Sequence, residues 1–302
     1  MLQPPIATLA SRAVVKIAGP EARGFLKGLL TRDAPEPGKA AFAALLTPQG
    51  KILFDFLMAG VEDGVLLDCD AGSADSLVKR LTLYRLRAKA TIERLAGWSA
   101  AVSFDAGSEA PAESIRFPDP RLLGLGERFI FRNSLHPEEP RPILRDAALR
   151  AAPQDEGAGR LEGGANFASE ADYDRRRIAL GVPEFGKDFG PEEVFLLDVN
   201  YDALHGVDYK KGCFVGQEVT SRMKRKGEVR KRTVRLSFDG PPPERGAAVT
   251  AGEAQLGAVL SGAEGMALAL LRLDRLEAAA GADILAGGRN VRVDIPAYLE
   301  RG

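Results

Sequence analysis

The spacing of the predicted strands changes at Arg232, and this change constrains the fold more than any other feature of the chain. Beyond Arg232, short apolar segments follow one another closely, with glycine and proline between them. These segments are Thr233 to Phe238, Ala247 to Thr250, Leu256 to Leu260, Met266 to Leu271 and Asn290 to Ile295. Short strands without long helices between them are typical of a small antiparallel barrel or sandwich. We therefore expect a separate C-terminal β domain over residues 233–302.

Before Arg232 the pattern mixes strands and helices, which indicates an α+β region over residues 1–232. Two apolar runs, Ala41 to Leu46 and Lys51 to Met58, are joined by a Pro-Gly turn and predict a β-hairpin. Capping residues and helical spacing predict helices that begin near residues 20, 73 and 169. Further strands are expected at 13–17, 65–69, 90–95, 99–104, 128–131 and 194–199, with one short helix around 143–150.

One stretch, Lys210 to Arg232, concentrates the reactive and charged residues. It holds one cysteine, nine cationic side chains and two acidic ones, which gives it a charge of +7. The whole chain has a net charge of −1, so the other residues sum to −8. The stretch is therefore a local cationic patch, which favours an anionic partner such as an acidic protein or RNA. The structural alternative is the solvated face of a linker.

Cys213 follows Lys210, Lys211 and Gly212 and precedes a segment that can begin a helix. Neighbouring ammonium groups and the positive end of a helix dipole both stabilise a thiolate. A functional thiol is one interpretation of this residue, and a small buried apolar residue is the other. The second cysteine, Cys69, lies 144 positions away and no CxxC occurs, so neither a zinc site nor a disulfide framework is predicted. A reducing compartment is the simpler interpretation.

The sequence lacks the signatures of several other enzyme classes. It has no GxxxxGK[ST], GxSxG or HExxH motif, and no GxGxxG after a strand. The only histidines, His136 and His205, leave little room for imidazole-based metal sites or a nucleophile–histidine mechanism. No apolar run is long enough to span a membrane, and MLQPPIATLASR matches neither a signal peptide nor a transit peptide. We expect a cytoplasmic protein with no membrane segment.

The run KGCFVGQE at residues 211–218 resembles the K-G-C-[YF]-x-G-Q-E signature of the YgfZ family. These proteins are folate-binding relatives of the glycine-cleavage T-protein and are associated with assembly or repair of iron–sulfur enzymes. The resemblance extends in order from Val14 to Ile295, and the motif residues are Lys211, Gly212, Cys213, Phe214, Gly216, Gln217 and Glu218, with Arg222 also fitting. It implies an α+β fold of three lobes, in which two mixed α/β lobes surround a folate site and are followed by a C-terminal antiparallel β-barrel.

Two positions depart from the T-protein pattern. The T-protein has two successive acidic residues in the strand that matches residues 51–58, whereas this chain has Phe54 followed by Asp55. The family glutamate associated with folate is replaced by Ala179. The resemblance therefore implies an accessory factor for assembly or repair of [4Fe–4S] enzymes rather than a folate-dependent aminomethyltransferase or methyltransferase, which stays the first alternative.

Reduced folate requires a carboxylate at its pterin edge, an apolar or aromatic wall and cations for its glutamate tail. The carboxylate candidates are Asp55, Glu184 and Glu218; the wall candidates are Tyr173 and Phe185; the cation candidates are Arg222, Lys224 and Lys226. Asp55 stands in an apolar strand, so it either faces solvent or has a hydrogen-bond partner, because an unpaired buried charge is costly. Both interpretations stay open.

We expect tetrahydrofolate or a derivative as the cofactor and Cys213 as the key residue. One thiolate cannot hold a cluster alone, because clusters normally have four protein ligands. A transient role with iron–sulfur client enzymes, tRNA-modifying ones among the candidates, is therefore the most economical hypothesis. The second alternative is an RNA- or protein-binding module that uses the basic residues 222–232, with strongly salt-dependent binding.

Overall fold

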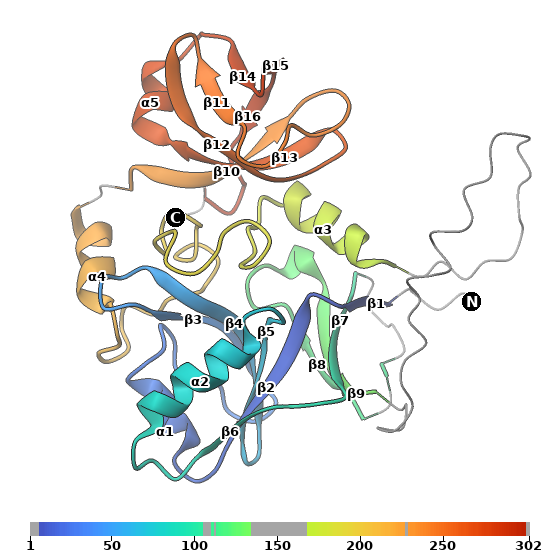
Figure 1. The fold of residues 1–302 in the computed structure, drawn as a ribbon, viewed down its shortest axis with the longest axis vertical. Helices are drawn as coiled ribbons and strands as arrows, with labels where there is room; N and C mark the ends of the chain where they lie inside the picture. The colour runs from blue at the N-terminus through green and yellow to red at the C-terminus, as the bar shows by residue number, and fades with distance from the viewer. Residues whose placement is uncertain (1–5, 105–109, 112, 134–167, 227–228, 300–302) are drawn as a thin grey trace, which may run out of the picture.

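The structure is a computed structural model that describes residues 6–104, 110–111, 113–133, 168–226 and 229–299. Within these residues, three β-sheets of five, four and seven strands carry the fold. Two of the sheets form a lower body, and the third forms a barrel above it, with helix α3 and an irregular segment between them (Figure 1). Within the described residues, no helix combines the length and the apolar character of a membrane span.

The five-stranded sheet is antiparallel and has the order β3-β4-β5-β2-β6. Its strands are β2 Arg12–Ala18, β3 Ala40–Leu46, β4 Ile52–Val61, β5 Gly64–Asp70 and β6 Thr91–Arg94. Helices α1 Ala22–Lys27 and α2 Ala74–Arg85 pack on one face of this sheet through a core that includes Leu26, Leu77 and Leu81. The predicted hairpin is confirmed, since β3 and β4 pair with Leu45 opposite Phe54.

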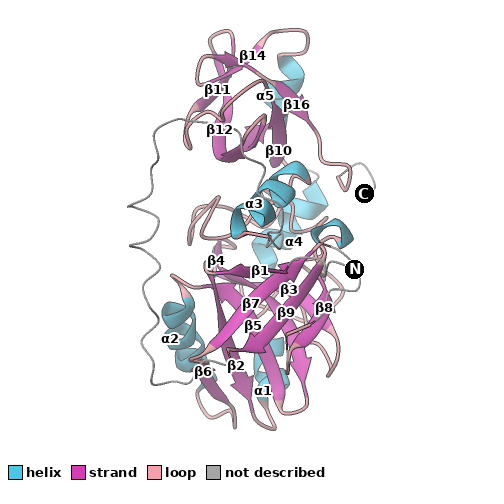
Figure 2. Cartoon of the chain, turned by 90° about the vertical axis from the view of Figure 1, so that its right-hand side faces the viewer, coloured by secondary structure: helices cyan, strands magenta, loops and turns pink. Residues whose placement is uncertain are grey.

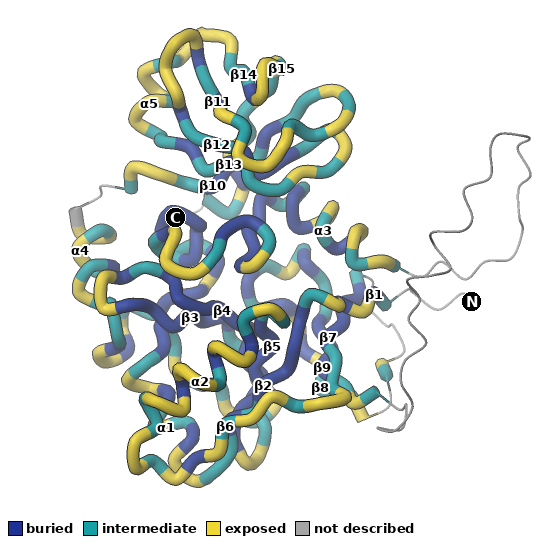
Figure 3. The backbone as a smooth tube through the Cα atoms, viewed as in Figure 1, coloured by how far each residue is buried: buried dark blue, intermediate teal, exposed yellow. Residues whose placement is uncertain are grey.

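The four-stranded sheet covers the other face of the five-stranded one (Figure 2). Its order is β1-β7-β9-β8, with β1 Ile6–Leu9, β7 Trp98–Ser103, β8 Ile115–Pro118 and β9 Glu127–Arg132, and a 3-10 helix spans Leu123–Leu125. Val102 and Ile130 of this sheet share one core with Phe42 and Leu57 of the five-stranded sheet. The buried residues of the body lie mainly between the two sheets and beneath the irregular segment that follows α3 (Figure 3).

Helix α3 Glu170–Ala179 begins with the predicted capping residues. Ser169 accepts a hydrogen bond from the Asp172 amide, and the Asp172 carboxylate accepts one from the Ser169 amide, so the capping box is confirmed. The chain then runs irregularly to helix α4 Gln217–Lys226. The predicted helix around 143–150 lies outside the described residues.

The strand predicted at 194–199 is wrong, because the structure has consecutive turns there. The Asp198 amide donates to the Phe195 carbonyl at 3.1 Å, and the Tyr201 amide donates to the Leu196 carbonyl at 3.0 Å. Asn200 has a φ of 63° within these turns, which continue to His205. The apolar residues of this segment are mostly buried against the rest of the protein. Their hydrophobicity therefore indicated that the segment is buried, but it did not indicate that its backbone is extended.

The C-terminal sheet has the order β15-β14-β11-β12-β13-β10-β16 and is antiparallel throughout. Its elements are β10 Lys231–Ser237, β11 Ala248–Ala251, β12 Ala254–Ala263, β13 Met266–Arg272, α5 Leu273–Ala278, β14 Ile284–Ala286, β15 Arg289–Asn290 and β16 Arg292–Asp294. Val234, Leu236 and Leu271 lie in its own core. The short α5 and β14 were not predicted, and the strand expected at 290–295 is split into two.

Candidate functional site

Cys213 is exposed on a loop in which Lys211 and Phe214 are buried. On one side, the Lys211 ammonium donates to the Lys27 carbonyl at 2.9 Å and to the Leu30 carbonyl at 2.6 Å, at the end of α1. On the other side, Phe214 packs into the core between the two sheets of the body. These two anchors hold the loop against the body and leave the thiol facing solvent.

The first turn of α4 packs on the turn of the β3–β4 hairpin, directly after this loop. Gly216 has a φ of +79°, and a Cβ there would lie 2.7 Å from the Thr47 carbonyl oxygen. A Cβ on Gly50 would lie 3.0 Å from the Cβ of Val219. The glycines therefore allow a close approach of two backbones, which places Cys213 relative to strand β4.

The two cysteines differ in accessibility, and Lys211 has a different role from the one expected. Burial raises the pKa of the Cys69 thiol to about 12, so this thiol stays protonated in the core. The ammonium of Lys211, which we expected to stabilise a Cys213 thiolate, is directed at the α1 carbonyls and lies 3.3 Å from Asp33. Its burial lowers its pKa. Cys213 is therefore the solvent-accessible thiol of this chain.

Asp55 is buried in the body, which decides between the two interpretations of this carboxylate. Its Oδ2 accepts a hydrogen bond from the Tyr201 hydroxyl, and its Oδ1 has no hydrogen-bond partner. Burial raises the pKa of Asp55 to about 6, although the charge of Arg12 opposes this shift. The carboxyl group therefore titrates just below neutral pH.

Tyr173 and Glu184 belong to a buried network of arginines and carboxylates. The Tyr173 hydroxyl donates to Glu184 and accepts hydrogen bonds from Arg121 at 2.9 Å and Arg128 at 2.6 Å. Burial disfavours the charge on Glu184, but the charges of Arg12 and Arg121 outweigh it and hold the pKa of this carboxyl far below its usual range. Both predicted folate contacts are thus occupied by partners within the protein.

A cleft of about 590 Å³ opens between α2, strand β4 and the segment 185–193. Its walls combine aromatic rings, carboxylates and guanidinium groups, including those of Phe54, Phe185, Phe189, Asp70, Glu193, Arg80 and Arg245. The rings of Phe54 and Phe185 lie 6.5 Å apart between centroids. Arg245 comes from the barrel and donates to the Asp188 carbonyl at 3.1 Å, so both parts of the molecule contribute to this cleft.

The structure separates the residues that were predicted to form one folate site. Phe185 lines the cleft, whereas Asp55, on the face of β4 opposite Phe54, points into the body with Tyr173 and Glu184. Gln217, Glu218 and Arg222 lie on helix α4, where Glu218 and Arg222 are exposed. Gly212 is exposed next to Cys213. Sequence reasoning missed Asp70, Arg80 and Arg245, because no local pattern connects these three positions.

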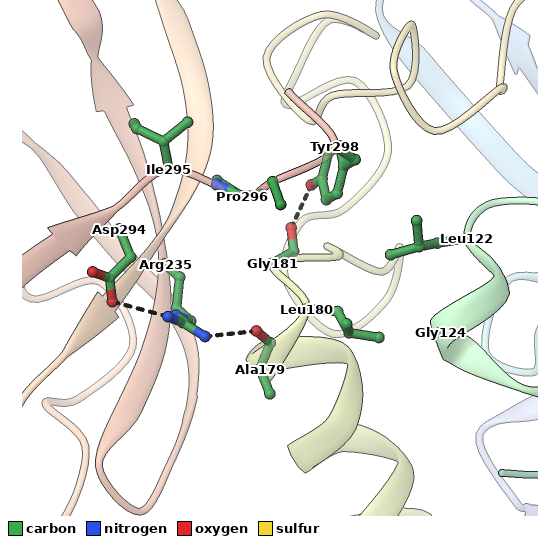
Figure 4. Close-up of a pocket in the computed structure, with 11 residues that line it drawn as sticks. Leu122, Gly124, Ala179, Leu180, Gly181, Arg235, Asp294, Ile295, Pro296 and Tyr298 are labelled. Atoms are coloured by element: carbon green, nitrogen blue, oxygen red, sulfur yellow. Dashed lines mark hydrogen bonds and ion pairs between the residues drawn. The ribbon is translucent and has the colours of Figure 1, made fainter. Parts of the chain in front are cut away.

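A second cavity, of about 390 Å³, lies where the barrel meets α3 (Figure 4). Arg235 of the barrel donates to the Ala179 carbonyl at 2.8 Å and pairs with Asp294 at 3.1 Å. The Tyr298 hydroxyl donates to the Gly181 carbonyl at 2.6 Å. These polar groups satisfy one another, so the cavity forms part of the junction between the barrel and the body.

Comparison with known proteins agrees with this architecture. Residues 230–301 match the family described as CAF17, C-terminal beta-barrel domain. Over 98% of its length the chain superposes on 85% of a crystal structure of glycine cleavage system aminomethyltransferase T from Bartonella henselae, with a TM-score of 0.69 and 17% identity. The predicted fold class, a T-protein-like α+β architecture with a C-terminal antiparallel barrel, is therefore confirmed.

Two curated relatives extend over most of the chain. The iron-sulfur cluster assembly factor IBA57, mitochondrial, of Homo sapiens is 30% identical over 299 residues, covering 89% of this chain and 78% of the relative. The homolog from Mycosarcoma maydis is 32% identical over 259 residues, covering 79% of this chain and 59% of the relative. The predicted link to iron–sulfur cluster assembly is thus supported through relatives of a different name from the YgfZ family that the motif resembled.

The names of these relatives also correct the expected compartment. Both are called mitochondrial, which contradicts the cytoplasmic localisation inferred from the sequence. That inference was wrong because it depended on the absence of a targeting pattern, and an absent pattern does not establish a compartment. With 30% identity over most of both chains, the protein belongs to the IBA57 family of iron–sulfur cluster assembly factors.

Proposed function

We propose that this protein supports assembly or repair of [4Fe–4S] enzymes through the thiol of Cys213, in the manner implied by the YgfZ-like motif. The observation that carries this proposal is an exposed cysteine between two buried anchors, Lys211 and Phe214. A thiol that only filled space would be buried, as Cys69 is. Relatives named as iron–sulfur cluster assembly factors give the chemical context.

The thiol acts together with ligands from another protein. The sequence has two cysteines, and Cys69 is buried in β5, so Cys213 alone faces solvent. Because clusters are normally held by four protein ligands, a single thiolate here contributes one ligand to a cluster held by a client. As the Cys213 sulfur binds iron, the bond from iron to one of the client's thiolates breaks and the released thiolate takes up the proton that Cys213 loses, so the exchange needs no oxidant or reductant.

We further propose that tetrahydrofolate or a derivative binds in the cleft beside α2. The cleft offers the three kinds of group that reduced folate requires. Phe54 and Phe185 supply an aromatic wall, Asp70 supplies a carboxylate and Arg80 with Arg245 supplies cations for the glutamate tail. When bound, the folate would supply one-carbon chemistry, and these residues would bind and orient it. Of the residues proposed from sequence, only Phe185 contributes to this wall.

The alternative of an aminomethyltransferase has one specific observation against it. Phe54 takes the place of the first of the two acidic residues expected from the T-protein resemblance, and its side chain lines the cleft. An apolar ring there cannot accept a proton or a conventional hydrogen bond from an amine, both of which a carboxylate can accept. Formation of methylenetetrahydrofolate from an aminomethylated donor would favour the transferase over the accessory factor.

The Cys213 proposal is tested in cells that lack the protein, by measuring the activity of a [4Fe–4S] tRNA-modifying enzyme. The native chain and Cys69→Ala should restore this activity, whereas Cys213→Ala should not. Cys69→Ala is the matched control, because it removes the other thiol from a buried position. Rescue by Cys213→Ala at a comparable protein level would contradict a role for this thiol.

The folate proposal is tested by the affinity of the purified protein for tetrahydrofolate. Arg80→Ala should weaken binding about three- to tenfold, because it removes an exposed cation from the cleft. Lys79→Ala removes the neighbouring exposed cation of α2, outside the cleft, and should leave affinity unchanged. Equal effects of the two substitutions would show that the cleft is not the folate site.

We also propose that residues 1–232 and 233–302 form separate domains. The strands after Arg232 have their own core, with Val234 and Leu236 at its start. Independent folding of the separately expressed segment 233–302 would test this boundary.

A further inference from the structure

Helix α4 has a cationic side that faces solvent close to Cys213. The helix packs on the body through Thr220, which is buried, and Met223, which lies against the core between the sheets. The helix also exposes Arg222, Lys224 and Arg225, of which Lys224 lies over the Tyr209 ring of the body, and we name these three exposed cations the α4 cationic face. The packing fixes the helix on the body (Figure 1), so these cations are held on the element that directly follows the loop of Cys213.

The charges of the α4 cationic face are not neutralised within the described residues. Two other cations of the same stretch are used internally, since Lys211 binds carbonyls of α1 and Arg232 pairs with Asp202 at 2.5 Å. None of the three residues of the face pairs with a described carboxylate. Lys224 instead lies 3.8 Å from the centroid of the Tyr209 ring. The face therefore presents a positive potential to an approaching molecule.

The proposed ligation of a cluster by Cys213, close to this face, indicates that the partner is anionic. A cluster held by four thiolates is anionic, because the thiolate charges outweigh the charge of the oxidised iron–sulfide core. A protein that presents such a cluster, with carboxylates around it, would approach the cationic face favourably and at an increased rate. Cys213 would then meet the cluster with its thiol.

We propose that the α4 cationic face is the docking surface for an acidic protein that carries a thiolate-ligated iron–sulfur cluster. The inference rests on the proposed function of Cys213, which it extends to the recognition of the client. The face orients the partner by long-range attraction, while the thiol makes the iron contact. Recognition and ligation are therefore separate properties of neighbouring residues.

RNA fits this face less well than an acidic protein does. Single-stranded nucleic acid is bound by cationic grooves with aromatic rings on which bases stack. The ring of Tyr209 beside this face is half-buried and is already covered by Lys224. A helix of ten residues is also only about 15 Å long, which limits the number of phosphates it can contact.

The test measures binding of the full-length protein to an acidic plant-type [2Fe–2S] ferredoxin, used as the probe. The variant Arg222→Glu/Lys224→Glu/Arg225→Glu reverses the α4 cationic face. The control Lys79→Glu/Arg87→Glu/Arg175→Glu makes the same change in net charge at exposed positions on or next to α2 and on α3. Since all six residues are exposed, both variants should fold, which circular dichroism and thermal unfolding verify.

The native protein should bind the probe with an affinity that falls as salt rises from about 50 to about 200 mM, because the attraction is screened. Reversal of the α4 cationic face should weaken binding about tenfold or more at the lower salt, and the control should change it less than about threefold. Equal weakening by both variants would overturn the proposal. Tighter binding of a short single-stranded RNA than of the ferredoxin, lost in the α4 variant, would instead identify a nucleic-acid surface.

The proposed docking surface and the proposed role of the thiol can be refuted independently of each other. Cys213→Ala should retain most of the probe affinity, because the cations are unchanged. If that variant rescues cells, the thiol proposal fails while the binding measurement still decides the docking surface. If it does not rescue cells and the α4 reversal binds the ferredoxin as tightly as the native protein, the docking surface fails while the thiol proposal stands.

Discussion

At the scale of single residues, Lys211 shows how a charged side chain in a motif can act inside the fold. Its ammonium binds two carbonyl oxygens at the end of α1, where helix carbonyls have no partner within the helix. The contact joins the loop of Cys213 to α1, which is distant in the sequence. Lys211 thus positions the thiol, while the exposed Cys213 is available to a partner.

Substitution of Lys211 by methionine should therefore destabilise the protein and loosen the loop. We expect the free energy of unfolding to fall by about 1–3 kcal/mol, because the α1 carbonyls lose a charged donor in a buried place. Urea unfolding measures this change. Lys210→Met, at the exposed neighbouring residue, should alter stability by less than about 0.5 kcal/mol. A loss of equal size at Lys210 would contradict the assignment.

Asp55 should make stability depend on pH in a window set by its pKa. Its folded-state pKa is raised from 3.8 to about 6, so between about pH 4 and pH 6 the folded state binds more protons than the unfolded state. Its contribution to stability is therefore highest below pH 4 and is lost as the pH rises through 6, by about 3 kcal/mol in total.

The comparison with Asp55→Asn isolates this effect, because asparagine keeps an acceptor for the Tyr201 hydroxyl and does not titrate. Urea unfolding of both proteins from pH 4 to pH 7.5 should show the native protein losing stability relative to the variant as the pH rises. A difference that stays constant with pH would show that Asp55 does not titrate in this range.

At the scale of elements, the contact between α4 and the β3–β4 turn depends on glycine. Gly216 combines a left-handed backbone with a close backbone neighbour, so Gly216→Ala should cost about 1–3 kcal/mol of unfolding free energy and displace the start of α4. Gly212→Ala is the matched control, because a Cβ there meets no atom within 4 Å. Thermal unfolding compares the two variants, and equal destabilisation would refute the packing argument.

At the scale of the whole molecule, Asp188 joins the barrel to the body. Its carboxylate pairs with Arg177 of α3 at 2.5 Å and accepts a hydrogen bond from the Ser261 amide of the barrel at 3.0 Å. Both Asp188 and Arg177 are buried. The connection therefore fixes α3, the segment 185–193 and the barrel relative to one another, and with them the cleft that Arg245 reaches.

Asp188→Ala should lower stability by about 3–5 kcal/mol, because it leaves the Arg177 guanidinium buried and without its main counter-charge. Amide hydrogen exchange at Ser261 should also become faster, since this amide loses its acceptor. Arg292→Ala breaks a pair with Asp294 in which Arg292 is 76% exposed, and should cost less than about 1 kcal/mol. Unchanged exchange at Ser261 in the Asp188 variant would contradict the proposed connection.

Local patterns in the sequence were sufficient for the elements whose stability depends on near neighbours. The Ser169 capping box, the β3–β4 hairpin and the closely spaced strands after residue 232 were all predicted from residues a few positions apart. The KGCFVGQE motif likewise predicts Cys213 as the key residue, and the thiol of this residue is exposed. Hydrophobic periodicity and capping residues depend on backbone conformation, so these helices and strands can be predicted from the sequence alone.

The tertiary structure alone decided the surroundings of the charged residues and the composition of the cleft. Asp55 and Lys211 are buried, and the cleft combines Asp70, Arg80 and Arg245 from three separate parts of the chain. The apolar run at 194–199 folds into turns, which also depends on its contacts with distant parts of the chain. Burial, charge pairing and hydrogen-bond satisfaction depend on which distant segments meet, and no local pattern in a single sequence records that meeting.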